Sequence, residues 1–239
     1  FRVIFGLRFS DEEKEVDKSS ITAAPGETVS DPFLAFLFSD AGLALANEHD
    51  YSLKRSEKHW TGNLNFQLDI NDETMVYLNF SNGFKGGGFD ESNALGNMDF
   101  AEFEDENVES IELGAKLGFW DGRGRANMAM FHSVYEDVQV STFDGNCCFV
   151  VGNAAKSKVE GFEADIELAL AEGLVLTAAF AYLDATYQSF PDAACNEAQF
   201  LATIAAGGAR ADCLQDLSGK PLQFAPEWSG NIGLRYDIA

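Results

Sequence analysis

Residues 60–73 read Trp-Thr-Gly-Asn-Leu-Asn-Phe-Gln-Leu-Asp-Ile-Asn-Asp-Glu, and this stretch decides the fold class. Apolar side chains occupy one parity of the stretch at Trp60, Leu64, Phe66, Leu68 and Ile70, while Thr, Asn, Gln and Asp fill the other. Successive side chains of a β-strand point to opposite faces, so the pattern predicts a strand with one apolar and one polar face. Asn71-Asp72-Glu73 supplies the residue types of a tight turn.

The same alternation recurs along the chain and predicts an all-β protein of about eight antiparallel strands. The strands are expected at about 1–10, 60–70, 74–85, 111–119, 124–143, 162–170, 174–188 and 224–238. Three connections are tight turns, at 71–73, 121–123 and 171–173. The connections between them are long and polar, at roughly 17–55, 87–106, 144–157 and 190–222.

This alternation of short and long connections favours a transmembrane β-barrel, in which periplasmic turns are short and extracellular loops are long. The expected strands reach ten or more residues, against about five or six in soluble sheets and the ~9–11 that cross a bilayer. Trp60 and Trp228 fall near the expected outer strand ends, and Phe119 and Tyr236 near the periplasmic ends. Interfacial aromatic girdles have this placement.

Composition agrees with this interpretation and excludes other classes. The chain has 239 residues, no apolar run of the ~18 residues a transmembrane helix needs, and 21 Phe and 22 Gly against 5 Pro. The net charge of -23 argues against nucleic acid as a partner, because phosphate binding needs clustered Lys and Arg. It fits a solvated, charged surface; the functional alternatives are cation attraction at the cell surface and bridging to lipopolysaccharide through divalent ions.

Several segments resemble TonB-dependent outer-membrane receptors of the iron-complex type. Residues 81–89, Ser-Asn-Gly-Phe-Lys-Gly-Gly-Gly-Phe, resemble the GFKPGGF segment of that family, with Gly86 where the family often has Pro. Residues 109–116 resemble its ES-E-G-K strand. Further resemblances follow in order at 131–139, 153–156, 159–163, 224–228 and 234–236.

The resemblance implies that residues 1–239 are part of the receptor β-barrel domain, about eight strands of a larger, roughly 22-stranded barrel. Both ends look cut and would lie on the periplasmic side, and no plug domain, TonB box or terminal strands are recognisable. The implied location is the bacterial outer membrane. The implied function is active uptake of a scarce nutrient, by preference a ferric-siderophore complex. Outer-membrane lipid, lipopolysaccharide and, through other parts of the receptor, the TonB complex are the implied partners.

Two other functions remain open from the residues. One is a small passive or structural outer-membrane barrel of eight strands closed on itself, since eight strands can close around side chains. The other is a secreted sandwich that binds carbohydrate, which requires the apolar parity to be buried within the protein. No catalytic arrangement stands out, so no enzyme is expected, and no cofactor or metal site is expected either.

Candidate ligand contacts come from aromatic residues in or beside the long connections. Phe84 and Phe89 flank the glycine run Gly86–Gly88, where glycine is expected to permit unusual backbone angles. Phe36 belongs to an apolar island at 33–38 that is too short to span a membrane. This island is expected to pack the loop onto itself or onto neighbouring loops, with a ligand contact as the alternative.

Four cysteines are disulfide candidates. Cys195 and Cys213 would close a loop worth on the order of 3 kcal/mol in the chain-entropy model, and a short helix is expected inside it at 200–209. For the adjacent Cys147 and Cys148 a vicinal disulfide, partners elsewhere in the full-length protein and a metal contact all stay open.

The three histidines and the acidic run before the fourth strand are expected to be structural or solvated. His49, His59 and His132 are isolated in sequence. The acidic run comprises Asp99, Glu102, Glu104, Asp105 and Glu106 and lacks the spacing of an EF-hand calcium loop.

Overall fold

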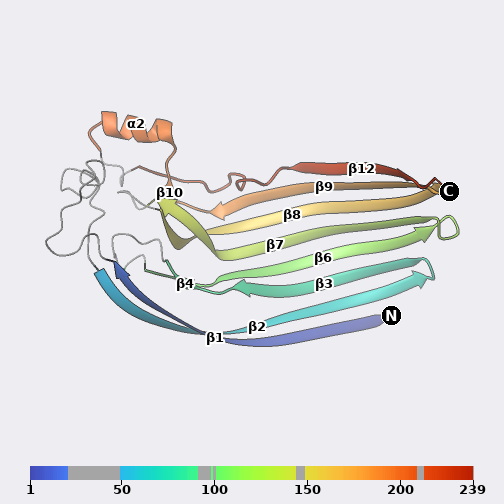
Figure 1. The fold of residues 1–239 in the computed structure, drawn as a ribbon, viewed down its shortest axis with the longest axis horizontal. Coiled ribbons are helices and arrows are strands. Elements are labelled where there is room, and N and C mark those ends of the chain that lie inside the picture. The colour runs from blue at the N-terminus through green and yellow to red at the C-terminus, as the bar shows by residue number, and fades with distance from the viewer. Residues whose placement is uncertain (21–48, 91–97, 99–100, 144–148, 209–212, 239) are drawn as a thin grey trace.

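The computed structural model describes residues 1–20, 49–90, 98, 101–143, 149–208 and 213–238. Its main body is one eight-stranded antiparallel sheet in which each long strand pairs with the next one along the chain (Figure 1). In spatial order the strands are β1 (Arg2–Ser20), β2 (His49–Asn71), β3 (Thr74–Lys85), β6 (Glu106–Phe119), β7 (Gly124–Phe143), β8 (Phe149–Ala171), β9 (Leu174–Ser189) and β12 (Trp228–Tyr236). The predicted all-β meander is confirmed.

The three tight turns lie together at one end of the sheet, beside both chain ends (Figure 1). In the first, the N–H of Glu73 donates to Oδ1 of Asn71 at 2.9 Å. In the second and third, Gly122 and Gly173 adopt φ values of 81° and 74°, which glycine reaches without a steric penalty.

The opposite end carries the smaller elements (Figure 1). β4 (Gly88–Phe89) pairs with β5 (Glu102–Phe103), and β10 (Ala193–Ala194) pairs with β11 (Leu214–Gln215). Between the latter two lies the helix α2 (Glu197–Ala205), which begins three residues before the expected 200–209. It begins there because Asn196 and Gln199 form a reciprocal capping box.

Two of the expected connections are shorter than predicted. β1 continues to Ser20 and β2 begins at His49, and β8 already begins at Phe149. In β1 and β2, hydrophobic alternation does not reveal the extension because both faces are mostly polar there. The start of β8 is apolar on both parities at Phe149, Val150 and Val151, so it shows no alternation either. Cross-strand ion pairs accompany the pairing instead, as between Lys54 and Glu15 at 2.9 Å.

The sheet is open within the described residues: β1 and β12 are its two edges and do not pair with each other. The chain therefore does not form the closed eight-stranded barrel considered above. The eighth strand is also shorter than expected, because Phe224 lies before it, fully exposed and at φ 58°.

The apolar parity of the strands faces outward rather than into a core. Leu113, Met130 and Ile232 are 50%, 55% and 77% exposed, which rules out the sandwich with a buried apolar face. Instead, aromatic side chains form cross-strand pairs on this face. Ring centroids are 4.9 Å apart for Phe9 and Trp60, and 4.6 Å apart for the equivalent pair between β9 and β12, Tyr182 and Trp228.

The strand between these pairs and the tight turns has the length of a membrane-crossing strand. β12 runs from Trp228 to Tyr236, 9 residues, within the ~9–11 that a tilted transmembrane strand needs. Among the described helices none combines the length and apolarity needed to span a membrane.

Candidate functional site

A charged cluster covers the polar face of the sheet at its loop end, just beyond the level of Trp60. Arg55, Glu57 and His59 alternate along β2, and Lys14 is the direct register partner of Arg55 on β1. β3 pairs with β2 only as far as Ser81, which lies opposite Asn63, so this part of β2 lacks β3 beside it. The chain after β3 returns over it through β4 and β5 and brings Glu102, Glu104 and Asp105 into contact. The term rim cluster is used below for seven residues: Lys14, Arg55, Glu57, His59, Glu102, Glu104 and Asp105.

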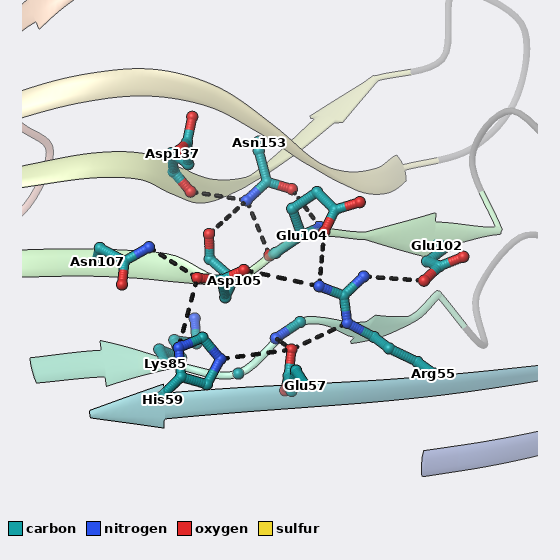
Figure 2. Close-up of polar contacts among 12 residues, drawn as sticks. Arg55, Glu57, His59, Lys85, Glu102, Glu104, Asp105, Asn107, Asp137 and Asn153 are labelled. Atoms are coloured by element: carbon teal, nitrogen blue, oxygen red, sulfur yellow. Dashed lines mark hydrogen bonds and ion pairs between the residues drawn. The ribbon is translucent and has the colours of Figure 1, made fainter. Parts of the chain in front are cut away.

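Arg55 is the centre of the rim cluster (Figure 2). Its side chain is only 9% exposed and donates to Glu57 at 3.0 Å, to Glu102 at 2.8 Å and to Glu104 at 2.6 Å. The hydrogen bond to Glu104 raises the pKa of Arg55, while burial lowers it and the bonds to Glu57 and Glu102 add to the rise. Arg55 is thus a permanent cation that binds the returning chain to β2.

Glu57 is its buried counterpart, with a side chain 6% exposed. Nζ of Lys14 donates to it at 3.1 Å and the N–H of Gly87 at 3.2 Å, in addition to Arg55. Burial raises the pKa of Glu57, but the hydrogen bonds from Arg55, Lys14 and Gly87 outweigh burial, so the pKa lies below 4.5. Glu57 is therefore an ionised carboxylate with little contact to solvent.

The glycine run allows this close approach. A Cβ on Gly86 would lie 2.5 Å from Oε1 of Glu57, and one on Gly87 would lie 2.6 Å from both Cζ of Arg55 and the carbonyl oxygen of Phe103. Neither glycine has a positive φ. The expectation that these glycines permit unusual backbone angles is wrong: they are needed for space.

The far side of the returning segment is bound to β7 and β8 (Figure 2). Asn153 accepts from the N–H of Glu104 at 2.7 Å and donates to the carbonyl oxygens of Glu104 at 2.9 Å and Asp137 at 2.7 Å. Asp137 sits in a bulge of β7 at φ 54°, where the β7–β8 register shifts. Gln139 donates to the carbonyl oxygens of Gly86 and Glu104. The segment is therefore held between the β1–β2 and β7–β8 hairpins.

A second outer segment is closed covalently. Cys195 and Cys213, the pair proposed from their spacing, form a disulfide with their Cα atoms 5.4 Å apart, and it encloses α2. Cys147 and Cys148 lie outside the described residues.

The family model of the TonB dependent receptor-like β-barrel matches residues 1–239, the whole chain. The chain belongs to the TonB-dependent receptor family. It is therefore an outer-membrane protein with the tight turns on the periplasmic side and the rim cluster on the extracellular side. The family and its structural neighbours are transporters, not enzymes.

Solved structures of the family share the fold. The ferric yersiniabactin uptake receptor FyuA of Yersinia pestis is 16% identical with a TM-score of 0.66, and 99% of this chain covers 28% of it. The siderophore receptor PiuA of Acinetobacter baumannii is 15% identical with a TM-score of 0.66, and 99% of this chain covers 29% of it. The ferric-catecholate import receptor Fiu of Escherichia coli K12 is 15% identical with a TM-score of 0.59, and 99% of this chain covers 30% of it. The chain thus spans less than a third of each of these receptors.

Below the rim, the polar face of the receptor strands carries paired polar side chains. Tyr77 donates to Glu112 at 2.7 Å, and Arg125 donates to Glu167 at 2.7 Å. In a barrel with the apolar face toward lipid, this face lines the interior.

Of the three aromatic residues proposed as ligand contacts, Phe84 lies against a residue of the rim cluster. The ring of Phe84 stacks on His59, with centroids 3.8 Å apart and 17° between planes. Phe89 belongs to β4 and is half-buried. Phe36 lies outside the described residues.

Sequence reasoning missed the rim cluster itself. The acidic run was expected to be solvated, and Glu102 and Glu104 are indeed 42% and 70% exposed, but both residues and Asp105 also pair with Arg55. The one signal in the sequence is the alternation Arg55-x-Glu57-x-His59, which places a cation, an anion and an imidazole on one strand face.

Proposed function

We propose that the receptor containing this chain actively takes up a scarce nutrient across the bacterial outer membrane, and that this nutrient is a ferric-siderophore complex. The observation that carries the proposal is the family match over the whole chain. The similar structures are receptors for ferric yersiniabactin, for a siderophore and for ferric catecholates, and they favour iron as the cargo. Iron is cargo in this proposal, and no resident cofactor is proposed.

The chain contributes an interior wall and part of the extracellular rim. Its polar face gives a hydrophilic complex a compatible surface, and its outward aromatic and aliphatic face contacts lipid and lipopolysaccharide. Coupling to the TonB complex requires other parts of the receptor. Phe84, Phe89 and Phe36 are proposed as ligand contacts, since aromatic side chains give a large contact area at low entropic cost.

The test uses the full-length receptor in iron-starved cells that lack their own siderophore receptors. We expect uptake of radioactive iron from one or a few ferric siderophores, and loss of that uptake when the tonB gene is deleted. Uptake that persists without TonB would contradict active transport. A receptor that supports TonB-dependent uptake of a metal-free nutrient, with no ferric siderophore accepted, would contradict the cargo.

The ligand contacts are tested in the same assay. Phe89→Ala should raise the ligand concentration needed for half-maximal uptake. Phe180→Ala is the matched control, because Phe180 lies on the outward face beside Trp228. Equal behaviour of the two variants would remove Phe89 from the binding site.

A further inference from the structure

The imidazole of His59 makes only two long contacts to acidic groups in the part of the chain that the structure describes (Figure 2). Its side chain is 15% exposed, and Nε2 is buried without a partner among the described residues. Nε2 lies 3.8 Å from Oε2 of Glu57, and Nδ1 lies 3.9 Å from Oδ2 of Asp105. Both separations exceed the ~2.7–3.2 Å of a hydrogen bond. A buried polar atom in this situation needs an explanation.

The spacing of these groups suits a metal ion between them. Glu57, His59 and Asp105 each offer one ligand atom, and the three atoms lie within 4.8 Å of one another. Metal–ligand bonds of about 2.1 Å place two ligands roughly 3.4 Å apart at a tetrahedral angle, and farther apart at wider angles. The two carboxylates face opposite nitrogens of His59, and one ion takes a single imidazole nitrogen. The ion would therefore bind at the unpartnered Nε2 beside Glu57, and the carboxylate of Asp105 would have to move toward it.

The local charge also favours a cation. Glu12, Glu57, Glu102, Glu104 and Asp105 contribute five carboxylates, whereas Lys14 and Arg55 contribute two cations. Solvent screens part of this negative excess, because Glu102 and Glu104 are 42% and 70% exposed. A divalent ion would reduce the remaining excess beside the buried Glu57.

We propose that Glu57, His59 and Asp105 form a binding site for a divalent transition-metal ion such as Zn²⁺, and that the ion connects β2 to the chain before β6. One imidazole nitrogen with two carboxylate oxygens is a donor set that zinc accepts, whereas Ca²⁺ and Mg²⁺ bind through oxygen ligands. This site stands on its own residues and does not depend on the proposed cargo.

The neighbouring residues are placed to support such a site. Arg55 and Lys14 hydrogen-bond Glu57 and keep it ionised, as a ligand carboxylate must be. Oδ2 of Asp105 accepts from Nδ2 of Asn107 at 2.7 Å. Phe84 stacks on the imidazole and fixes its plane.

The competing explanation is a protonated His59 that forms two long ion pairs. The two explanations differ in one measurable respect: only the first requires His59 for metal affinity.

The test is zinc titration of the complete receptor, purified in detergent without a histidine tag and stripped with a chelator. His59→Gln should lose one zinc ion per receptor or weaken it by about tenfold or more. His132→Gln is the matched control, because His132 is 44% exposed and bonds Glu160 at 2.7 Å outside the cluster. Cobalt gives a second readout, since its absorption bands report nitrogen and oxygen ligation.

Equal zinc binding by wild type and His59→Gln would overturn the proposal, as would the absence of zinc binding in the wild type. If zinc binding is unchanged in His59→Gln but the pH dependence of the rim differs, the proposal is also overturned, and the result identifies the protonated histidine. If His59→Gln fails to fold, Asp105→Asn takes its place with the same expected loss.

Discussion

Two outer segments of this receptor chain fold back over the sheet, and they are held in opposite ways. The β4–β5 segment, residues 86–90 and 101–105, is held by the rim cluster, in which Arg55 is 9% exposed. The α2 segment, residues 190–208 and 213–222, is closed by the Cys195–Cys213 disulfide. It also rests on a small apolar cluster of Ala155, Phe190 and Ala193.

Because of this difference, the two segments are expected to lose order under different solution conditions. A disulfide restricts the unfolded ensemble and an apolar cluster gains from burial, and neither depends strongly on pH or ions. Buried ion pairs depend on every partner, because removing one leaves an uncompensated charge. The β4–β5 segment is therefore the one whose order can follow pH and metal ions, while the α2 segment follows redox conditions.

The largest effect is expected from Arg55→Met. Glu57, which is 6% exposed, loses one of its two cationic partners, and breaking such a buried pair costs about 3–5 kcal/mol. The pairs with Glu102 and Glu104 add little, because these carboxylates are 42% and 70% exposed. Hydrogen exchange should show faster exchange of the amides at 101–107 and unchanged exchange in α2. Arg125→Met, which breaks the exposed pair with Glu167, should leave both regions unchanged. Unaltered protection at 101–107 in Arg55→Met would contradict the role of the cluster.

The next largest effect is expected from the double variant Cys195→Ser with Cys213→Ser, which removes the disulfide of the α2 segment. Opening this loop should cost the α2 segment on the order of 3 kcal/mol, so protease should cleave within it more readily. The β4–β5 segment should keep its hydrogen-exchange protection. If both segments loosen together, the two are one cooperative unit and the comparison fails.

A smaller effect is expected from Gly87→Ala. The added Cβ would meet Cζ of Arg55 and the carbonyl oxygen of Phe103 at 2.6 Å, and accommodating such a contact costs about 1–3 kcal/mol. Gly152→Ala is the matched control, because nothing lies within 4 Å of its Cβ position. Protection of 86–90 should fall only in Gly87→Ala, and equal protection in the two variants would show that the space is not needed.

Acidification should have the smallest effect of the four, because burial partly cancels the hydrogen bonds that lower the pKa of Glu57. A carboxyl whose folded pKa lies below its unfolded value stabilises the fold above that unfolded value, near 4.5. The stabilisation disappears as pH falls through the folded pKa. Exchange at 101–107, corrected for intrinsic rates, should accelerate below pH 4.5, and Glu57→Gln should flatten this dependence. A pH response of equal size in Glu57→Gln would assign it to another group.

The sheet was predictable from sequence wherever one face is apolar. The alternation from Trp60 to Ile70 gave the strand, its faces and its turn, because burial against lipid leaves a period of two. The extension of β2 back to His49 was not predictable in this way, because its two faces are both mostly polar. Strand pairing there leaves no hydrophobic signal.

The rim cluster was less predictable because its contacts are remote in sequence. Arg55 and Glu102 lie 47 positions apart, and no local pattern indicates which acidic residue of a long connection meets which cation. The glycine run was visible as a motif in the sequence. The need for glycine was not visible, because it arises only when the folded chain brings Arg55 and the carbonyl oxygen of Phe103 against Gly87.

The sequence distances within the rim cluster also bear on the order of folding. Every long strand of the sheet pairs with the next one along the chain, and the β2–β3, β6–β7 and β8–β9 hairpins close over tight turns and can form early. The bond from Lys14 to the carbonyl oxygen of Gly87 spans 73 positions and gains little until β1, β2 and β3 are already in place. The rim is thus expected to assemble last. Defects in it should spare insertion of the receptor into the membrane and appear only in the finished extracellular surface.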